Sequence, residues 1–146
     1  MTQLLLAIHD DDLRCALSLL LQDTGFEVTS VPNGITAFAR LVKSPQPLVV
    51  MLDTHLPERD VAEKLLDLAS AGGWLGRHRY IVLSTTYPDE YAPALAFYLA
   101  TMPVPTLTNP CDADAVLGAV GRAAATLTSA PDIEREAMPV ALASAS

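Results

Sequence analysis

Polar residues follow several apolar runs of this sequence, at the points where the runs end. They are His9, Asp10, Asp11, Asp53, Ser84, Thr85, Thr108 and Asn109. A carboxylate directly after a buried strand, such as Asp53, is held on a rigid edge, and carboxylates can accept a phosphoryl group covalently. The Ser84 hydroxyl is then a candidate hydrogen-bond donor to that group. Asp, Asn and Ser after strands also form turns and caps, so it is their joint occurrence that favours a site.

The elements that must position these residues alternate along the chain. Apolar runs predict strands at Leu4–Ile8, Phe26–Val31, Leu48–Leu52, Tyr80–Leu83 and Val104–Thr108. Helical spacing predicts helices at Leu13–Leu21, Ile35–Lys43, Val61–Ala71, Asp89–Ala100 and Asp112–Leu127. This order predicts an α/β fold, a doubly wound (βα)5 five-stranded parallel sheet with helices on both faces. In such sheets the functional site lies at the carboxyl ends of the strands.

The first two helices carry further local signals. Asp12 is the expected N-cap of the first helix, and Gly25 stands where a helix C-cap is expected. The second helix has an apolar side, formed by Ile35, Phe38, Ala39 and Val42.

Composition excludes several classes of protein. The chain has 146 residues, 51% of them hydrophobic, with 9 Lys and Arg against 17 Asp and Glu for a net charge of −8. This length suits one domain, and an acidic chain does not suit nucleic-acid phosphates. No apolar run reaches the roughly 20 residues of a membrane span, no basic secretory signal is present, and two cysteines make no disulfide framework. We therefore expect a cytoplasmic protein that binds neither nucleic acid nor membrane.

The segment around Asp53 resembles the receiver domain of two-component response regulators. Receivers carry the phosphoacceptor Asp at this strand end, a Pro four residues later and often an Asp seven residues later. Asp53, Pro57 and Asp60 match these positions. The resemblance covers most of the chain and implies a flavodoxin-like receiver domain at 1–128, followed by a flexible C-terminal tail at 129–146.

The resemblance also implies roles for residues outside this segment. Ser84 stands at the family's hydroxyl position, with Thr85 as its neighbour. Asn109 stands where the family has a Lys that pairs with the phosphorylated Asp, and Thr106 where many members have an aromatic switch residue. Asn brings no positive charge, and Thr has no ring to swing inward. The resemblance is therefore to an atypical receiver.

The pair of acids that follows the first strand in the family, and holds Mg²⁺ there, is a further departure. An ungapped register puts Ile8 and His9 at the two positions. A shifted register would put Asp10 and Asp11 there, with a shorter loop before the helix. The leucine spacing of the helix favours the ungapped register.

The consequence concerns metal binding. Mg²⁺ demands oxygen ligands in near-octahedral geometry, so the resemblance leaves at most a weak Mg²⁺ site at Asp10, Asp53 and His55. The alternative to this Mg²⁺ site is a transition-metal site formed by His9, His55 and Asp53.

Together these residues predict a stand-alone, atypical response regulator in phosphorelay signal transduction, with Asp53 as the candidate phosphoacceptor. Its expected partners are a sensor kinase or phosphotransfer protein and a downstream protein that it contacts directly. Because phosphoryl transfer depends on charge neutralisation, slow self-phosphorylation and dephosphorylation are the only activity expected. The alternative is a degenerate receiver that acts as a phosphorylation-independent dimerisation or adaptor module.

An apolar stretch predicts a homodimer. Tyr91–Met102, which includes Tyr98, is unusually apolar for a helix with one solvated face. In the resembled family the fourth helix, fifth strand and fifth helix form a common dimer surface. We therefore predict dimerisation through Tyr91–Met102 and Val104–Leu127.

Overall fold

Five parallel strands form one sheet in the order β2-β1-β3-β4-β5. The computed structural model describes residues 2–56, 64, 67, 76–84, 96–97, 99–100, 104–108 and 112–129. The strands are β1 (Gln3–Ala7), β2 (Glu27–Val31), β3 (Val49–Asp53), β4 (Arg79–Ser84) and β5 (Thr106–Thr108). The five strands predicted from the apolar runs are therefore confirmed, with small shifts at their ends.

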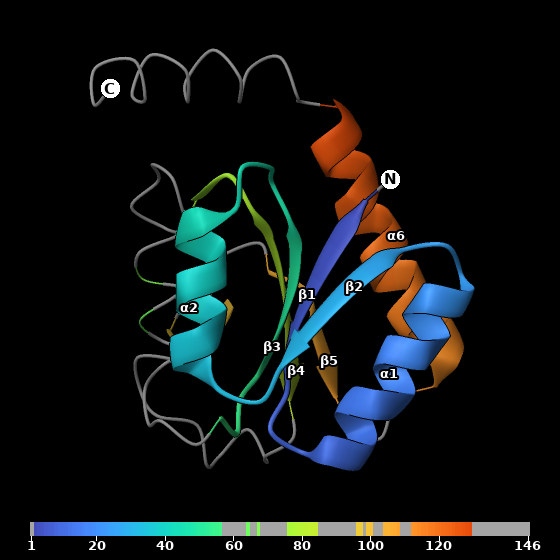
Figure 1. Ribbon diagram of the computed structural model, residues 1–146, viewed down its shortest axis with the longest axis horizontal. Helices are drawn as coiled ribbons and strands as arrows, with labels where there is room; N and C mark the ends of the chain where they lie inside the picture. Colours follow the sequence, from blue (N-terminus) through green and yellow to red (C-terminus); the bar gives the residue numbers. More distant parts are fainter. Residues whose placement is uncertain are drawn as a thin grey trace.

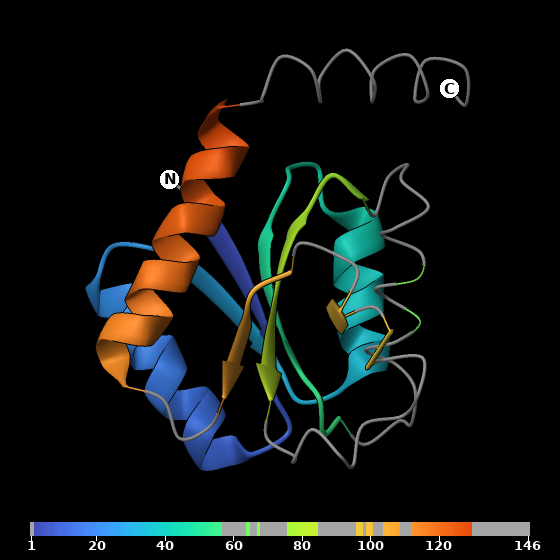
Figure 2. The ribbon, with the colours of Figure 1, turned by 180° about the vertical axis from the view of Figure 1, so that it is seen from behind.

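Helices cover both faces of the sheet. They are α1 (Asp11–Asp23), α2 (Gly34–Lys43) and α6 (Ala113–Ser129). Helices α1 and α6 lie on one face and α2 on the other (Figures 1 and 2), which confirms the doubly wound α/β class. The predicted helices at 61–71 and 89–100 lie mostly outside the described residues, and so does the predicted tail beyond residue 129.

The middle of the sheet is buried on both faces because the interior residues of its strands are apolar. All five residues of β3 are buried, and its four apolar residues alternate between two cores. Val50 packs in one core with Ala37 of α2, and Met51 packs in the other with Leu17 of α1 and Val116 of α6. An unalternated apolar run is the pattern that such two-sided burial requires.

Local hydrogen bonds fix both ends of α1. Asp10 is the N-cap, and its Oδ1 accepts a hydrogen bond from the Leu13 N–H at 3.0 Å. The prediction of Asp12 as the cap is wrong, because leucine spacing does not show where the first turn begins. Asp12 lies inside that turn, where its charge suits the helix dipole. Gly25 follows the helix at a φ of 103° and donates its N–H to the Gln22 carbonyl, which confirms the expected glycine stop.

The face of α2 that packs on the sheet consists of small residues and one leucine. Its buried residues are Gly34, Ala37 and Leu41. In contrast, Ile35 is 68% exposed and Phe38 is 40% exposed. The apolar side seen in the sequence is therefore not the side that packs on the sheet. Small side chains let the helix approach the strands closely, whereas a hydropathy pattern gives most weight to large ones.

A buried histidine joins the end of α2 to the sheet. His78 lies just before β4 and is 2% exposed. Its Nδ1 accepts a hydrogen bond from the Leu48 N–H at 2.9 Å, so the ring proton is on Nε2, which donates to the Leu41 carbonyl at 3.1 Å. Burial, and then the charge of Arg77, lower the pKa of His78 to about 4. The ring is therefore a neutral tie between helix and sheet.

Candidate functional site

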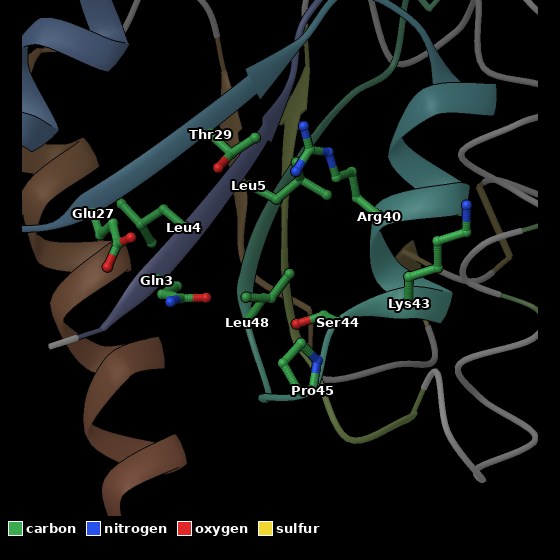
Figure 3. Close-up of a pocket in the computed structure, with 10 residues that line it drawn as sticks. All are labelled: Gln3, Leu4, Leu5, Glu27, Thr29, Arg40, Lys43, Ser44, Pro45 and Leu48. Carbon is green, nitrogen blue, oxygen red and sulfur yellow. The ribbon is translucent and has the colours of Figure 1, made fainter.

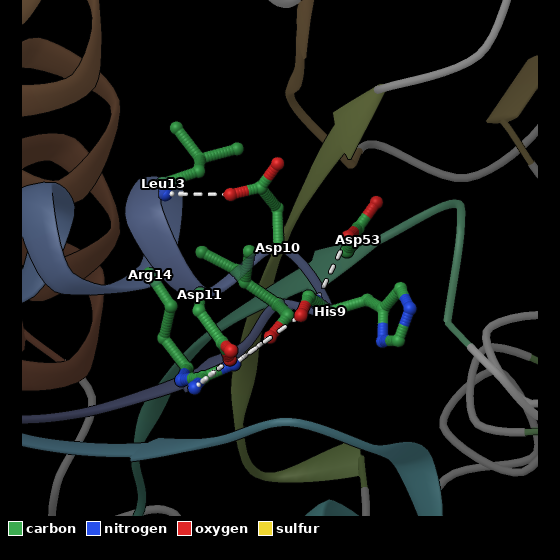
Figure 4. Close-up of polar contacts among 7 residues, drawn as sticks. His9, Asp10, Asp11, Leu13, Arg14 and Asp53 are labelled. Carbon is green, nitrogen blue, oxygen red and sulfur yellow. Dashed lines mark hydrogen bonds and ion pairs between the residues drawn. The ribbon is translucent and has the colours of Figure 1, made fainter.

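Two loops hold the carboxylate of Asp53 at the carboxyl edge of the sheet. Asp53 is the last residue of β3 and is 1% exposed. Its Oδ2 accepts a hydrogen bond from the backbone N–H of His9 at 3.1 Å (Figure 4), and its Oδ1 accepts one from the backbone N–H of His55 at 2.8 Å. One donor follows β1 and the other follows β3, so the two hydrogen bonds together fix the direction of the carboxylate.

The residues after β1 place an apolar side chain and an imidazole near this carboxylate. Ile8 is fully buried, and its N–H donates to the Val31 carbonyl at 3.1 Å. His9 is exposed, and its ring centroid lies 6.4 Å from that of His55. Neither Ile8 nor His9 provides a carboxylate beside Asp53.

The acids that come next are engaged by α1. Asp10 caps the helix through the Leu13 N–H, and Asp11 forms an ion pair with Arg14 (Figure 4). The Nη1 of Arg14 also donates to the Ile8 carbonyl at 2.9 Å. Arg14 therefore ties the loop after β1 to the first turn of α1. The sequence signal for this role is only an Asp and an Arg three residues apart, which is common on helix surfaces.

The residues at this edge do not fit a Mg²⁺ ion, which the family resemblance implies. Mg²⁺ requires near-octahedral oxygen coordination. Ile8 offers no ligand atom, the rings of His9 and His55 offer nitrogen, and Asp10 already uses one carboxylate oxygen in its cap. Within the part of the chain that the structure describes, no three His, Cys, Asp or Glu side chains form a metal-binding group. Neither of the two sets proposed from the sequence around Asp53 is therefore assembled as a metal site.

Ser84 lies beside Asp53 because their strands are neighbours. In the pairing of β3 with β4, Asp53 is opposite Leu83, so Ser84 stands one residue further along the same edge. Ser84 is 1% exposed. Thr106 pairs with Val82 at the start of β5, and its side chain is exposed.

The other site residues predicted from the sequence lie outside the described residues. They are Pro57, Asp60, Thr85, Tyr91, Tyr98 and Asn109. The described site therefore consists of one buried carboxylate and one buried hydroxyl on adjacent strands, flanked by two exposed imidazoles. Such an arrangement can present a carboxylate oxygen to a phosphoryl donor, with a hydroxyl close by to bind the transferred group.

Comparison with known proteins relates this arrangement to solved structures. No family model and no curated protein matches the chain. A sensor protein from Polaromonas sp. JS666 is similar at a TM-score of 0.70 and 21% identity, over 86% of this chain and 98% of that one. The signal receiver domain of a putative Luxo repressor protein from Vibrio parahaemolyticus is similar at 0.73 and 20%, over 91% and 97%. The chain has the fold of a response regulator receiver domain. Chemotaxis protein CheY4 from Vibrio cholerae is similar at 0.67 and 21%, over 84% and 98%.

In this receiver fold the ends of β1, β3 and β4 form the edge that carries Asp53 and Ser84. Sequence identities near 20% support the fold and leave the activity to be argued from the residues of this chain. No helix in the described ranges is long and apolar enough to cross a membrane.

Proposed function

We propose that this protein is a receiver of two-component phosphorelay signalling, with Asp53 as a phosphoacceptor of low reactivity. The observation that supports this most is the placement of Asp53 at the end of β3, beside Ser84 at the end of β4. The backbone N–H groups of His9 and His55 hold the carboxylate at the edge, where a phosphodonor would have to reach it.

Low reactivity follows from the charges that the site lacks. An aspartyl phosphate carries more negative charge than the free carboxylate, and a transferring phosphoryl group is stabilised mainly by positive charge and hydrogen bonds. Ile8 and His9 replace the acids that would hold a metal ion, and Asn109 replaces the Lys. Each such loss costs about 2.7–4 kcal/mol of transition-state stabilisation in other enzymes. Two together correspond to about four to six orders of magnitude in rate.

Partners follow from this role. A sensor kinase or phosphotransfer protein would supply the phosphoryl group, and a downstream protein would bind the receiver surface directly. Phosphorylation by a small-molecule donor, compared between the wild type and Asp53→Asn, tests the phosphoacceptor without knowledge of either partner. A slow adduct that requires Asp53 is the expected result.

A second candidate function is a receiver that works without phosphorylation, as an adaptor or dimerisation module. The contacts of Asp53 favour this function, because both oxygens of its carboxylate accept hydrogen bonds from backbone N–H groups and the residue is 1% exposed. In that case Asp53 serves as a structural tie between two loops. Absence of an adduct with any donor would favour this second candidate.

We also propose a homodimer through the segment Tyr91–Met102, β5 and α6. Phe97 is 60% exposed, and β5 is the edge strand of the sheet. Sedimentation at increasing concentration is expected to show dimers, and Phe97→Glu is expected to shift the population to monomers by placing a charge in the apolar contact. Leu19→Glu is the matched control, because Leu19 is 62% exposed on α1, which is not one of the elements of the proposed interface. Monomers alone at high concentration, or equal dissociation by both variants, would contradict the dimer.

A further inference from the structure

The amino edge of the sheet, opposite the edge that carries Asp53, contains a cavity of about 220 Å³. It lies between the first residues of β1 and β2 and the last turn of α2 (Figure 3). Leu5 and Leu48, which belong to the core on the α2 face, give it an apolar floor. The cavity is smaller than the roughly 300–1,000 Å³ of sites for drug-sized molecules. Any ligand that it takes is therefore small.

Charges of opposite sign stand on opposite sides of this floor. Arg40 projects from α2 on one side, and Glu27 projects from β2 on the other (Figure 3). Lys43 also lines the cavity, but its ammonium is directed away from the floor. The guanidinium of Arg40 reaches over Leu5 toward Thr29. Among the described residues none of the three charged side chains has an ion-pair partner. One cation, Arg40, and one anion, Glu27, thus face the same cavity with their charges unneutralised.

The wall that carries Arg40 is held in place by hydrogen bonds behind it. Arg77 donates to the carbonyl of Ser44, which lines the cavity, and the Ser44 hydroxyl donates to the Gln46 carbonyl at 2.7 Å. The ring of His78 holds the Leu41 carbonyl at the end of the same helix. A fixed wall keeps the loss of conformational freedom on ligand binding small.

We propose that this cavity binds a short zwitterion, with a carboxylate at one end, an ammonium at the other and an apolar chain between them. The carboxylate would lie against Arg40, since a guanidinium matches a carboxylate with two parallel hydrogen bonds. The ammonium would lie against Glu27, and the chain over Leu5 and Leu48. This is the chemistry of an ω-amino acid or of a dipeptide of small residues. The site is independent of Asp53 and goes beyond the proposed function.

Isothermal titration of the full chain with four probes tests the proposal. The probes are 6-aminohexanoate, hexanoate, hexylamine and dialanine. We expect 6-aminohexanoate to bind at least about fivefold more tightly than hexanoate or hexylamine, because each of these lacks one charge contact. Dialanine distinguishes a dipeptide ligand from an ω-amino acid. If dialanine binds more tightly than 6-aminohexanoate, the ligand is a peptide, and if it binds more weakly, the ligand is an ω-amino acid.

Variants assign the contacts. Arg40→Gln is expected to weaken the binding of 6-aminohexanoate by about fivefold. Glu27→Gln is expected to make 6-aminohexanoate and hexanoate bind equally. Arg122→Gln, an exposed arginine of α6, is the matched control and should bind like the wild type. Unchanged thermal unfolding shows that each variant is folded. No binding of 6-aminohexanoate or dialanine to the wild type, or equal binding of hexylamine and 6-aminohexanoate, would overturn the proposal.

Discussion

Replacing Ile8 and His9 together by Asp is expected to raise the rate of Mg²⁺-dependent phosphorylation of Asp53 by about two to three orders of magnitude. Ile8 has no ligand atom, and the backbone N–H of His9 already places this loop against the Asp53 carboxylate. Two carboxylates at these positions would add the oxygen ligands that Mg²⁺ requires. The measurement is the rate of adduct formation from acetyl phosphate, with Mg²⁺ and with EDTA.

The matched control for this gain is the double variant Ile8→Asn with His9→Asn. Its side chains have the same size as those of the Asp variant but carry no charge, so its phosphorylation rate should rise little above that of the wild type. Because Ile8 is fully buried, both double variants lose core packing, and their rates are compared well below their unfolding temperatures. A folded Asp variant that is no faster than the Asn variant, or equally fast in EDTA, would show that missing acids do not limit this site.

Acid is expected to destabilise the fold through His78. The pKa of this ring is lowered from 6.5 to about 4 by burial, so the unfolded chain binds a proton that the folded chain excludes. The stabilisation is fully present above pH 6.5 and is lost as the pH falls toward 4. Between pH 7 and pH 4 the free energy of unfolding is expected to fall by about 3 kcal/mol from this group.

Urea unfolding of the wild type and of His78→Gln at several pH values measures this contribution. Glutamine can accept the Leu48 N–H but does not titrate, so its stability should depend less on pH over this range. His55→Gln, which removes an exposed histidine, should keep the pH dependence of the wild type. If the free energies of unfolding of the wild type and His78→Gln changed equally with pH, titration of His78 would not explain the loss of stability in acid.

The parts of the fold that could be predicted have local causes in the sequence. Two-sided burial makes β3 an unbroken apolar run, and a φ of 103° after α1 calls for the glycine at position 25. The face of α2 could not be predicted, because close approach to the sheet selects Gly34 and Ala37 rather than the larger Ile35. The contact of His78 depends on segments about 30 residues apart, and no local pattern indicates it.

For the candidate site, the sequence predicts which residues stand at the ends of the strands. Asp53 and Ser84 follow apolar runs, and the parallel sheet brings them to neighbouring positions. The roles of the residues after β1 could not be read from the sequence, because Asp10, Asp11 and Asp12 are chemically alike. Only the start of α1 decides that Asp10 caps the helix and that Asp11 pairs with Arg14.

The most direct test of the account is intact-mass spectrometry after incubation with acetyl phosphate, on the wild type, Asp53→Asn and Asp12→Asn. Asp12 is an exposed acid of α1 and serves as the matched control for the loss of one charge. The account predicts a slow adduct of one phosphoryl group in the wild type and Asp12→Asn, little changed by EDTA and absent from Asp53→Asn. An adduct that persists in Asp53→Asn, or no adduct in the wild type with any donor, would contradict it.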